Sequence, residues 1–156
     1  MKLHEVLVPQ GVEVAVKASS KKQLLQHSAR RLASLTAYDE REINQQLQAR
    51  ERLGSTAVGG GVAIPHARLE SLDAPILYFA VMAAPIDFEA IDDQPVDLVA
   101  VLLAPFDSSS EHLKTLSRIS RLLRDEHLCS RLRGAASADA AFAILTEDEA
   151  LSYAAA

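Results

Sequence analysis

The residues best suited to chemistry lie between Gly54 and Arg68, where the sequence reads GSTAVGGGVAIPHAR. Within this stretch, Pro65 fixes its own φ and confines the preceding residue to extended backbone, so the chain enters His66 with little freedom. An imidazole is largely neutral near pH 7, and a ring held on a rigid turn suits nucleophilic attack or proton transfer. A solvent-facing loop histidine is the alternative, but the glycine-rich setting favours chemistry at His66.

Arg50 is the first candidate for an anion-binding group beside His66. It follows Ile43 by seven residues, which places it on the apolar face of a predicted helix, four residues before Gly54. An inward guanidinium needs an anionic partner, so we expect its fork to hold a phosphoryl group near His66. Extension of the side chain to solvent near the helix end is the alternative that periodicity leaves open.

His112 is the second candidate. It comes just after Ser109 and Ser110, one of which we expect to cap a long helix. The first turn of a helix disfavours a charged imidazolium, but it favours an anion and a neutral histidine that donates to it. An exposed first-turn histidine is the alternative.

Other motifs are weaker, and we expect neither a metal nor a cofactor. Gly54 and Gly59 have the first spacing of a phosphate-binding P-loop, but Gly60 stands where that motif requires Lys. Taken alone, Gly59 to Gly61 favours a glycine hairpin loop. The histidines lack zinc-site spacing, Cys129 is typical of a packed or surface thiol, and the acidic residues between 87 and 97 lack a calcium-loop glycine.

Composition limits the classes of partner that the protein is expected to bind and the cellular compartment in which it is expected to lie. The chain has 156 residues, of which 49% are hydrophobic and 24% charged, and these values predict one domain with a real core. A net charge of −5 and an aromatic content of 4% argue against nucleic-acid binding. No apolar stretch reaches the roughly 20 residues of a membrane helix, so we expect no membrane insertion. The single cysteine and the early charges at the N-terminus favour a cytoplasmic protein.

Strands and helices alternate, which is typical of an α/β domain. Nearly continuous apolar runs predict strands over 76–82 and 96–103 that are covered on both faces. Caps and helical periodicity predict helices from Ser19 or Ser20 to Leu35 and from Asp39 to near Gly54. The long helix after Ser109 or Ser110 is expected to bury Leu113, Leu116 and Ile119, and Ser137 is expected to cap a later helical piece.

Four stretches of the chain resemble the fructose/mannitol-type IIA components of the bacterial phosphoenolpyruvate-dependent phosphotransferase system. They are RERLGSTAVGGGVAIPH (50–66), AIDDQPVDL (90–98), HLKTL (112–116) and SKKQ (20–23). Among the branches of this family, the stand-alone nitrogen-regulatory one is the most similar. Gly60 and the pair Ala67-Arg68 depart from the residues that relatives often have, Asn and Gly-Lys.

The resemblance implies a fold and a set of roles. It implies a single domain over residues 1–156 with a mixed five-stranded sheet flanked by helices. His66 would accept a phosphoryl group from a small phosphocarrier protein and form a phosphohistidine intermediate, with Arg50 and His112 lining the site. Ser55 and Thr56 would help to orient the phosphoryl oxygens. The protein would act as a regulatory phosphocarrier rather than as a multiple-turnover metabolic enzyme.

The resemblance also implies regulated partner proteins, with potassium-transport regulators and sensor kinases as candidates, and the oligomeric state stays open. Three alternatives remain, one of them a small hydrolase that would use His66 and turn over without a protein donor. A sugar-specific IIA would donate its phosphoryl group to a separate transporter IIB domain. A phosphorylation-independent binding module would use His66 only structurally.

Overall fold

Two long antiparallel strands with apolar residues on both faces form the centre of the computed structural model, which describes residues 2–107 and 109–147. These are β5 (Ile76–Ile86) and β6 (Val96–Pro105). Successive residues of β6 alternate between two cores: Leu98 and Leu102 pack into one, and Val99 and Leu103 into the other. The prediction of strands covered on both faces is therefore confirmed.

Three short strands and β1 complete a mixed sheet of six strands. β1 (Val12–Val16) runs parallel to β5, and β2 (Ala57–Gly59) pairs antiparallel with β3 (Val62–Ala63). β3 and β4 (His66–Leu69) follow each other along the same edge of β6, both parallel to it. The expectation of five strands is thus short by one. Ile64 and Pro65 separate β3 from β4, because proline has no N–H to contribute to the ladder.

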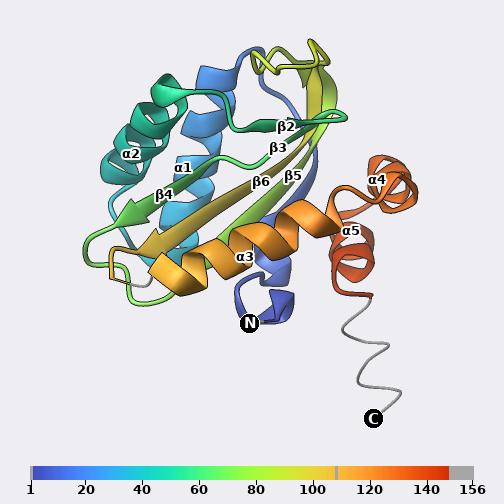
Figure 1. The fold of residues 1–156 in the computed structure, drawn as a ribbon. Helices are drawn as coiled ribbons and strands as arrows, with labels where there is room; N and C mark the ends of the chain where they lie inside the picture. The colour runs from blue at the N-terminus through green and yellow to red at the C-terminus, as the bar shows by residue number, and fades with distance from the viewer. Residues whose placement is uncertain (1, 108, 148–156) are drawn as a thin grey trace.

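Helices cover both faces of this sheet (Figure 1). On one face lie α1 (Lys21–Thr36) and α2 (Glu40–Leu53), and on the other α3 (Ser109–Leu122), α4 (Glu126–Arg133) and α5 (Ala138–Leu145). Each core is almost wholly aliphatic, as the low aromatic content requires. None of the helices in the described ranges is long and apolar enough to span a membrane.

The caps of most helices are those that the sequence predicted. The side chains of Ser20, Asp39 and Ser137 each accept a backbone N–H of the helix that follows, from Gln23, Arg41 and Ala140 respectively. The start of α3 differs from the prediction, because Ser109 and Ser110 both lie within the helix and residue 108 is outside the described residues. Leu113 was also expected to be buried, but 64% of it is exposed.

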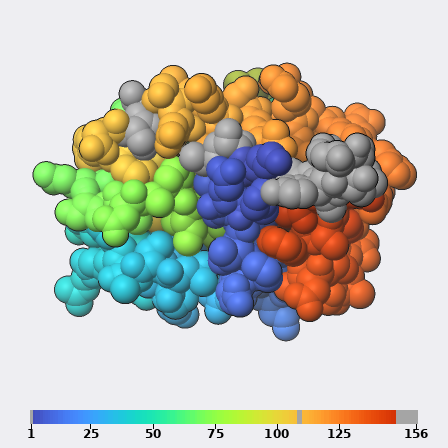
Figure 2. Space-filling view, turned by 90° about the horizontal axis from the view of Figure 1, so that it is seen from below, coloured from blue at the N-terminus to red at the C-terminus, as the bar shows by residue number. Residues whose placement is uncertain are grey.

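Two 3-10 turns, η1 (Leu3–Glu5) and η2 (Pro9–Gly11), close one end of the sheet. The N–H of Leu77 donates to the Val6 carbonyl at 2.9 Å, which ties this segment to the start of β5. Figure 2 shows the N-terminal segment in blue between α1 and α5. The candidate functional site lies at the edge of the sheet away from β1, where β2, β3 and β4 lie.

Candidate functional site

His66 is the first residue of β4, where the chain rejoins β6 after Pro65. The sequence placed it on a turn; instead the Pro65 carbonyl accepts the N–H of Leu102 at 2.9 Å, and the strand begins directly after it. The ring is half-buried, and its Nδ1 lies 2.9 Å from the Ile64 carbonyl oxygen. A carbonyl only accepts, so Nδ1 carries the proton and Nε2 keeps its lone pair.

His112, on α3, lies beside this ring. The two ring centroids are 5.5 Å apart with an interplanar angle of 54°. His112 is only 7% exposed, and its Nδ1 is buried without a hydrogen-bond partner in the part of the chain that the structure describes. The structure therefore brings together two histidines that are 46 positions apart in the sequence.

Arg50 completes the cluster from the last turn of α2. Its side chain is half-buried, and Nη1 donates to the Gly54 carbonyl at 2.9 Å. Together with His66, His112 and Arg68, it lines an open cavity of about 630 Å³. Arg50 therefore lines the cavity but is only half-buried, whereas the buried stripe of α2 continues to Glu51. The anion-binding role predicted for the Arg50 guanidinium stays a prediction.

Both imidazoles are held in the neutral form. Burial lowers the pKa of His66, and the charge of Arg50 lowers it further, against the hydrogen bond to Ile64 and the carboxylate of Glu51, which raise it. Burial, together with His66 and Arg68, lowers the pKa of His112 to about 4. A neutral ring with a free Nε2 is a nucleophile, and the neighbouring cations suit an anionic reactant.

The glycine run forms the hairpin between β2 and β3. Gly59, Gly60 and Gly61 have φ values of +97°, +66° and +80°, a region that residues with a Cβ rarely adopt. The N–H of Gly60 donates to the Asp92 carboxylate at 2.9 Å, and the Gly60 carbonyl accepts from Arg133 at 2.8 Å. The interpretation of these glycines as a hairpin loop is therefore confirmed.

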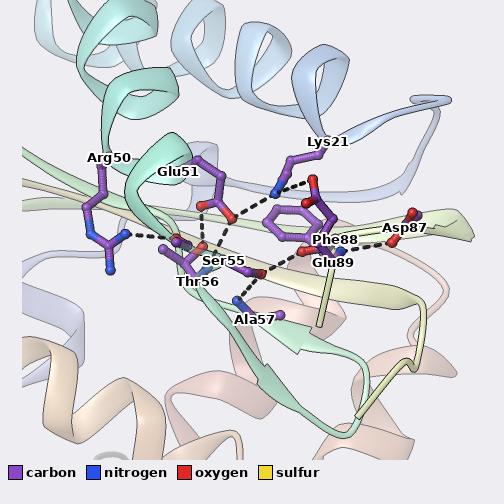
Figure 3. A network of polar contacts seen from close by, with 10 residues as sticks. Lys21, Arg50, Glu51, Ser55, Thr56, Ala57, Asp87, Phe88 and Glu89 are labelled. Carbon is purple, nitrogen blue, oxygen red and sulfur yellow. Dashed lines mark hydrogen bonds and ion pairs between the residues drawn. The ribbon is translucent and has the colours of Figure 1, made fainter. Parts of the chain in front are cut away.

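Ser55 and Thr56 lie on a second, smaller cavity of about 260 Å³, which also adjoins His66 and Arg50. The Ser55 hydroxyl donates to the Phe88 carbonyl at 2.5 Å and accepts the N–H of Ala57 at 3.2 Å. The Thr56 hydroxyl donates to the Glu51 carboxylate at 2.7 Å (Figure 3). Both hydroxyl protons are therefore engaged within the chain in this conformation.

Glu51, whose carboxylate accepts this hydrogen bond, is a residue that the sequence analysis did not predict for the site. Glu51 is 6% exposed and accepts both the N–H of Thr56, at 3.0 Å, and its hydroxyl. Lys21 pairs with the same carboxylate at 3.3 Å (Figure 3). A signal was available: Glu51 follows Ile43 and Leu47 at steps of four, so it continues the buried stripe of α2.

Of the residues predicted for the site, the structure brings His66, Arg50 and His112 around one cavity and places Ser55 and Thr56 on the adjoining one. Among the described residues, no group of three or more His, Cys, Asp and Glu side chains is arranged to hold a metal ion. Cys129 is buried, and its Sγ contacts the Leu123 carbonyl at 3.2 Å, as a packed thiol would. The arrangement is suited to transferring an anionic group to His66.

Comparison with known proteins places nearly the whole chain in one family. Residues 5–148 match the family model described as phosphoenolpyruvate-dependent sugar phosphotransferase system, EIIA 2. A nitrogen regulatory protein of Bradyrhizobium diazoefficiens is 46% identical over 93% of this chain and 95% of its own length. The crystal structure of nitrogen regulatory protein IIA-Ntr from Neisseria meningitidis superposes with a TM-score of 0.87 at 32% identity, over 92% of this chain and 99% of that one. The fructose-specific EIIABC component of Bacillus subtilis is 30% identical over 96% of this chain but only 24% of its own length.

Proposed function

The chain belongs to the EIIA 2 family of the phosphoenolpyruvate-dependent sugar phosphotransferase system, and on this basis we propose that it is a phosphocarrier whose acceptor atom is Nε2 of His66. One observation carries the proposal: Nδ1 of His66 is held by the Ile64 carbonyl, which leaves the Nε2 lone pair available beside Arg50 and His112. In this proposal residues 1–156 act as one domain of the IIA type.

The donor is a small phosphocarrier protein that carries its own phosphohistidine. Nε2 of His66 attacks the phosphorus in line, a P–N bond forms, and the donor's P–N bond breaks with its electron pair returning to the donor ring. The proton of His66 stays on Nδ1 throughout, hydrogen-bonded to the Ile64 carbonyl, so the phosphorylated ring keeps its orientation. Phosphoryl transfer of this kind depends mainly on positioning and on stabilisation of charge.

Arg50 and His112 supply that stabilisation. The guanidinium offers several N–H donors in a fixed fork, and Nη1 donates to the Gly54 carbonyl, the one hydrogen bond that the described residues provide for it. A neutral His112 approaches from α3 and donates one hydrogen bond without placing a like charge beside the attacking ring. Ser55 and Thr56 contribute to the orientation of the phosphoryl oxygens from the adjoining cavity, chiefly by fixing the loop before β2.

Apolar side chains around the cavity suit docking of a protein donor. Leu53 and Leu113, which line the cavity, are 85% and 64% exposed, and nearby Val58 is 52% exposed. Exposed apolar groups gathered at one site are typical of a protein-binding surface. A dianionic phosphoryl group added between them changes both the charge and the hydration of that surface, so phosphorylation would switch which proteins bind.

The regulatory branch is the first choice for this phosphocarrier. Its support is the likeness to nitrogen regulatory proteins, which extends over nearly the whole length of both chains. In this branch the targets are cytoplasmic partner proteins, with potassium-transport regulators and sensor kinases as candidates. The alternative, a sugar-specific IIA that donates to a separate IIB domain, has its support in the likeness to a fructose-specific component.

Intact-mass spectrometry tests the proposal. The protein is incubated with phosphoenolpyruvate, the first enzyme of the cascade and the small phosphocarrier, alongside His66→Ala and the matched control His127→Ala, whose histidine lies exposed on α4. We expect one acid-labile phosphoryl group on the wild type and on the control, and none on His66→Ala. No added mass with an active donor would refute the phosphocarrier function and favour a phosphorylation-independent binding module. Transfer onward to a fructose or mannitol IIB domain would favour the sugar-specific branch.

A further inference from the structure

We propose that Glu51 is a positioning residue for His66: through Thr56 and Ile64, its buried carboxylate holds the acceptor ring in the orientation that leaves Nε2 free. This inference rests on the proposed function, in which His66 is the acceptor.

A continuous series of hydrogen bonds joins the two residues. The Glu51 carboxylate accepts the N–H and the hydroxyl of Thr56, at 3.0 and 2.7 Å. The Thr56 carbonyl accepts the N–H of Ile64 at 3.0 Å, and the Ile64 carbonyl accepts Nδ1–H of His66 at 2.9 Å. Each link holds a residue whose other backbone group makes the next link, so displacement of Thr56 would shift Ile64 and with it the carbonyl that orients the ring.

The position requires a carboxylate rather than another acceptor. Three donors converge on Glu51: the N–H and the hydroxyl of Thr56, and the ammonium of Lys21 at 3.3 Å. An ionised carboxylate accepts all three with its two oxygens, whereas an amide would turn its NH2 group toward one of these donors. The side chain of Glu51 is only 4% exposed, so water has little access to replace a lost partner.

Glu51 lies in the last turn of α2 and also contacts the turn that follows the helix. The Glu51 carbonyl accepts the N–H of Gly54 at 3.2 Å, and Arg50 donates to the Gly54 carbonyl at 2.9 Å. The two neighbouring residues therefore hold the same turn, and their side chains point to different sides of it (Figure 3). Arg50 lines the cavity and Glu51 is buried. This coupling keeps the guanidinium and the acceptor ring in one fixed arrangement.

Lys21 supplies the positive charge beside Glu51, and its second acidic partner, Glu89, offers a matched control. Its ammonium lies 3.3 Å from Glu51 and also 3.3 Å from Glu89. The side chain of Glu89 is 77% exposed and shares the lysine with Glu51. Its backbone N–H donates to Asp87, and no hydrogen bond described in the structure joins it to Thr56. Removal of the Glu89 charge therefore perturbs Lys21 without breaking the series that leads to His66.

The test measures the tautomer of His66 and the transfer rate in the same variants. Imidazole ¹⁵N shifts report the fraction of His66 with the proton on Nδ1, and rapid mixing with the phosphorylated donor gives the rate. In Glu51→Gln we expect a mixture of tautomers and a transfer rate about 10- to 100-fold lower, because a misdirected ring loses its attack geometry. Glu89→Gln should match the wild type in both measurements.

Two milder variants keep the proposal testable if Glu51→Gln fails to fold. Thr56→Val loses only the hydroxyl donor and should shift the tautomer and the rate in the same direction, while Thr56→Ser should restore both. Wild-type tautomer and rate in the folded Glu51→Gln or Thr56→Val variants would overturn the proposal, as would an equal effect of Glu89→Gln. Failure of the wild type to accept phosphate at His66 would refute the proposed function separately, because the tautomer measurement needs no phosphorylation.

Discussion

Acidification should destabilise this protein through His112. In the folded state burial, His66 and Arg68 lower the pKa of His112 from an ordinary value of 6.5 to about 4, whereas the unfolded chain titrates near the ordinary value. The unfolded state therefore binds more protons between these two values, and stability is lost as the pH falls through this window. Above pH 6.5 the contribution is fully present, and below about pH 4 nothing more is lost.

The size of the effect follows from the same two values. Each pH unit is worth about 1.4 kcal/mol, so the whole window corresponds to about 3.5 kcal/mol of unfolding free energy. At about pH 5 the part already lost is about 2 kcal/mol. The ring borders an open cavity whose water screens the imidazolium, so we expect about 1–2 kcal/mol at that pH.

Urea unfolding at about pH 7.5 and about pH 5 measures this loss. In His112→Gln, the difference in unfolding free energy between the two pH values should be smaller than in the wild type by about 1–2 kcal/mol. His127→Gln removes an exposed histidine from α4 and serves as the matched control. NMR titration of the folded wild type follows His112 directly. A midpoint near 6.5 for this ring, or an unchanged pH dependence in His112→Gln, would refute the reasoning.

Two further predictions concern stability and donor docking. Tyr78→Phe removes the hydroxyl that donates to the Glu13 carboxylate at 2.7 Å, and should lower the unfolding free energy by about 1.5–3 kcal/mol in urea titration. A loss below about 0.5 kcal/mol would show that the bond contributes little to stability. Leu113→Asp places a charge on the exposed apolar rim of the cavity, and should slow phosphoryl transfer from the donor at least about tenfold while stability stays within about 0.5 kcal/mol. An unchanged transfer rate would exclude this rim as the docking surface.

The helix boundaries illustrate what local sequence controls. Asp39, Ser137 and one of the pair Ser19 and Ser20 were predicted as caps, because a side-chain oxygen satisfies an N–H only two or three residues away. Ser20 is the cap of the pair. The structure has each of these hydrogen bonds. Leu113 shows the limit of the same reasoning: it has helical spacing with the buried residues of α3, yet this end of the helix stands over an open cavity, so the side chain is exposed.

The candidate site likewise combines features that local sequence predicts with features that it does not. The sequence alone determined that the chain reaches His66 through a restrained proline, and that Arg50 lies at the end of α2 on the side that faces the site. Both follow from backbone restriction and helical periodicity, which act over a few residues.

Only the tertiary structure decided how the site is assembled. It decided that β3 and β4 share one edge of β6, that His112 lies 5.5 Å from His66, and that Glu51 holds Thr56. It also decided that the Ile64 carbonyl accepts a hydrogen bond from Nδ1–H of His66, which leaves Nε2 as the nitrogen with the lone pair. The pairing of β3 and β4 with β6 and the approach of His112 to His66 depend on strand register and on the packing of helices across the sheet, which join residues far apart in the chain. The contacts of Glu51 with Thr56 and of Ile64 with His66 join near neighbours in the sequence, but they depend on the path of the backbone between α2 and β4, which the periodicity of single elements does not specify.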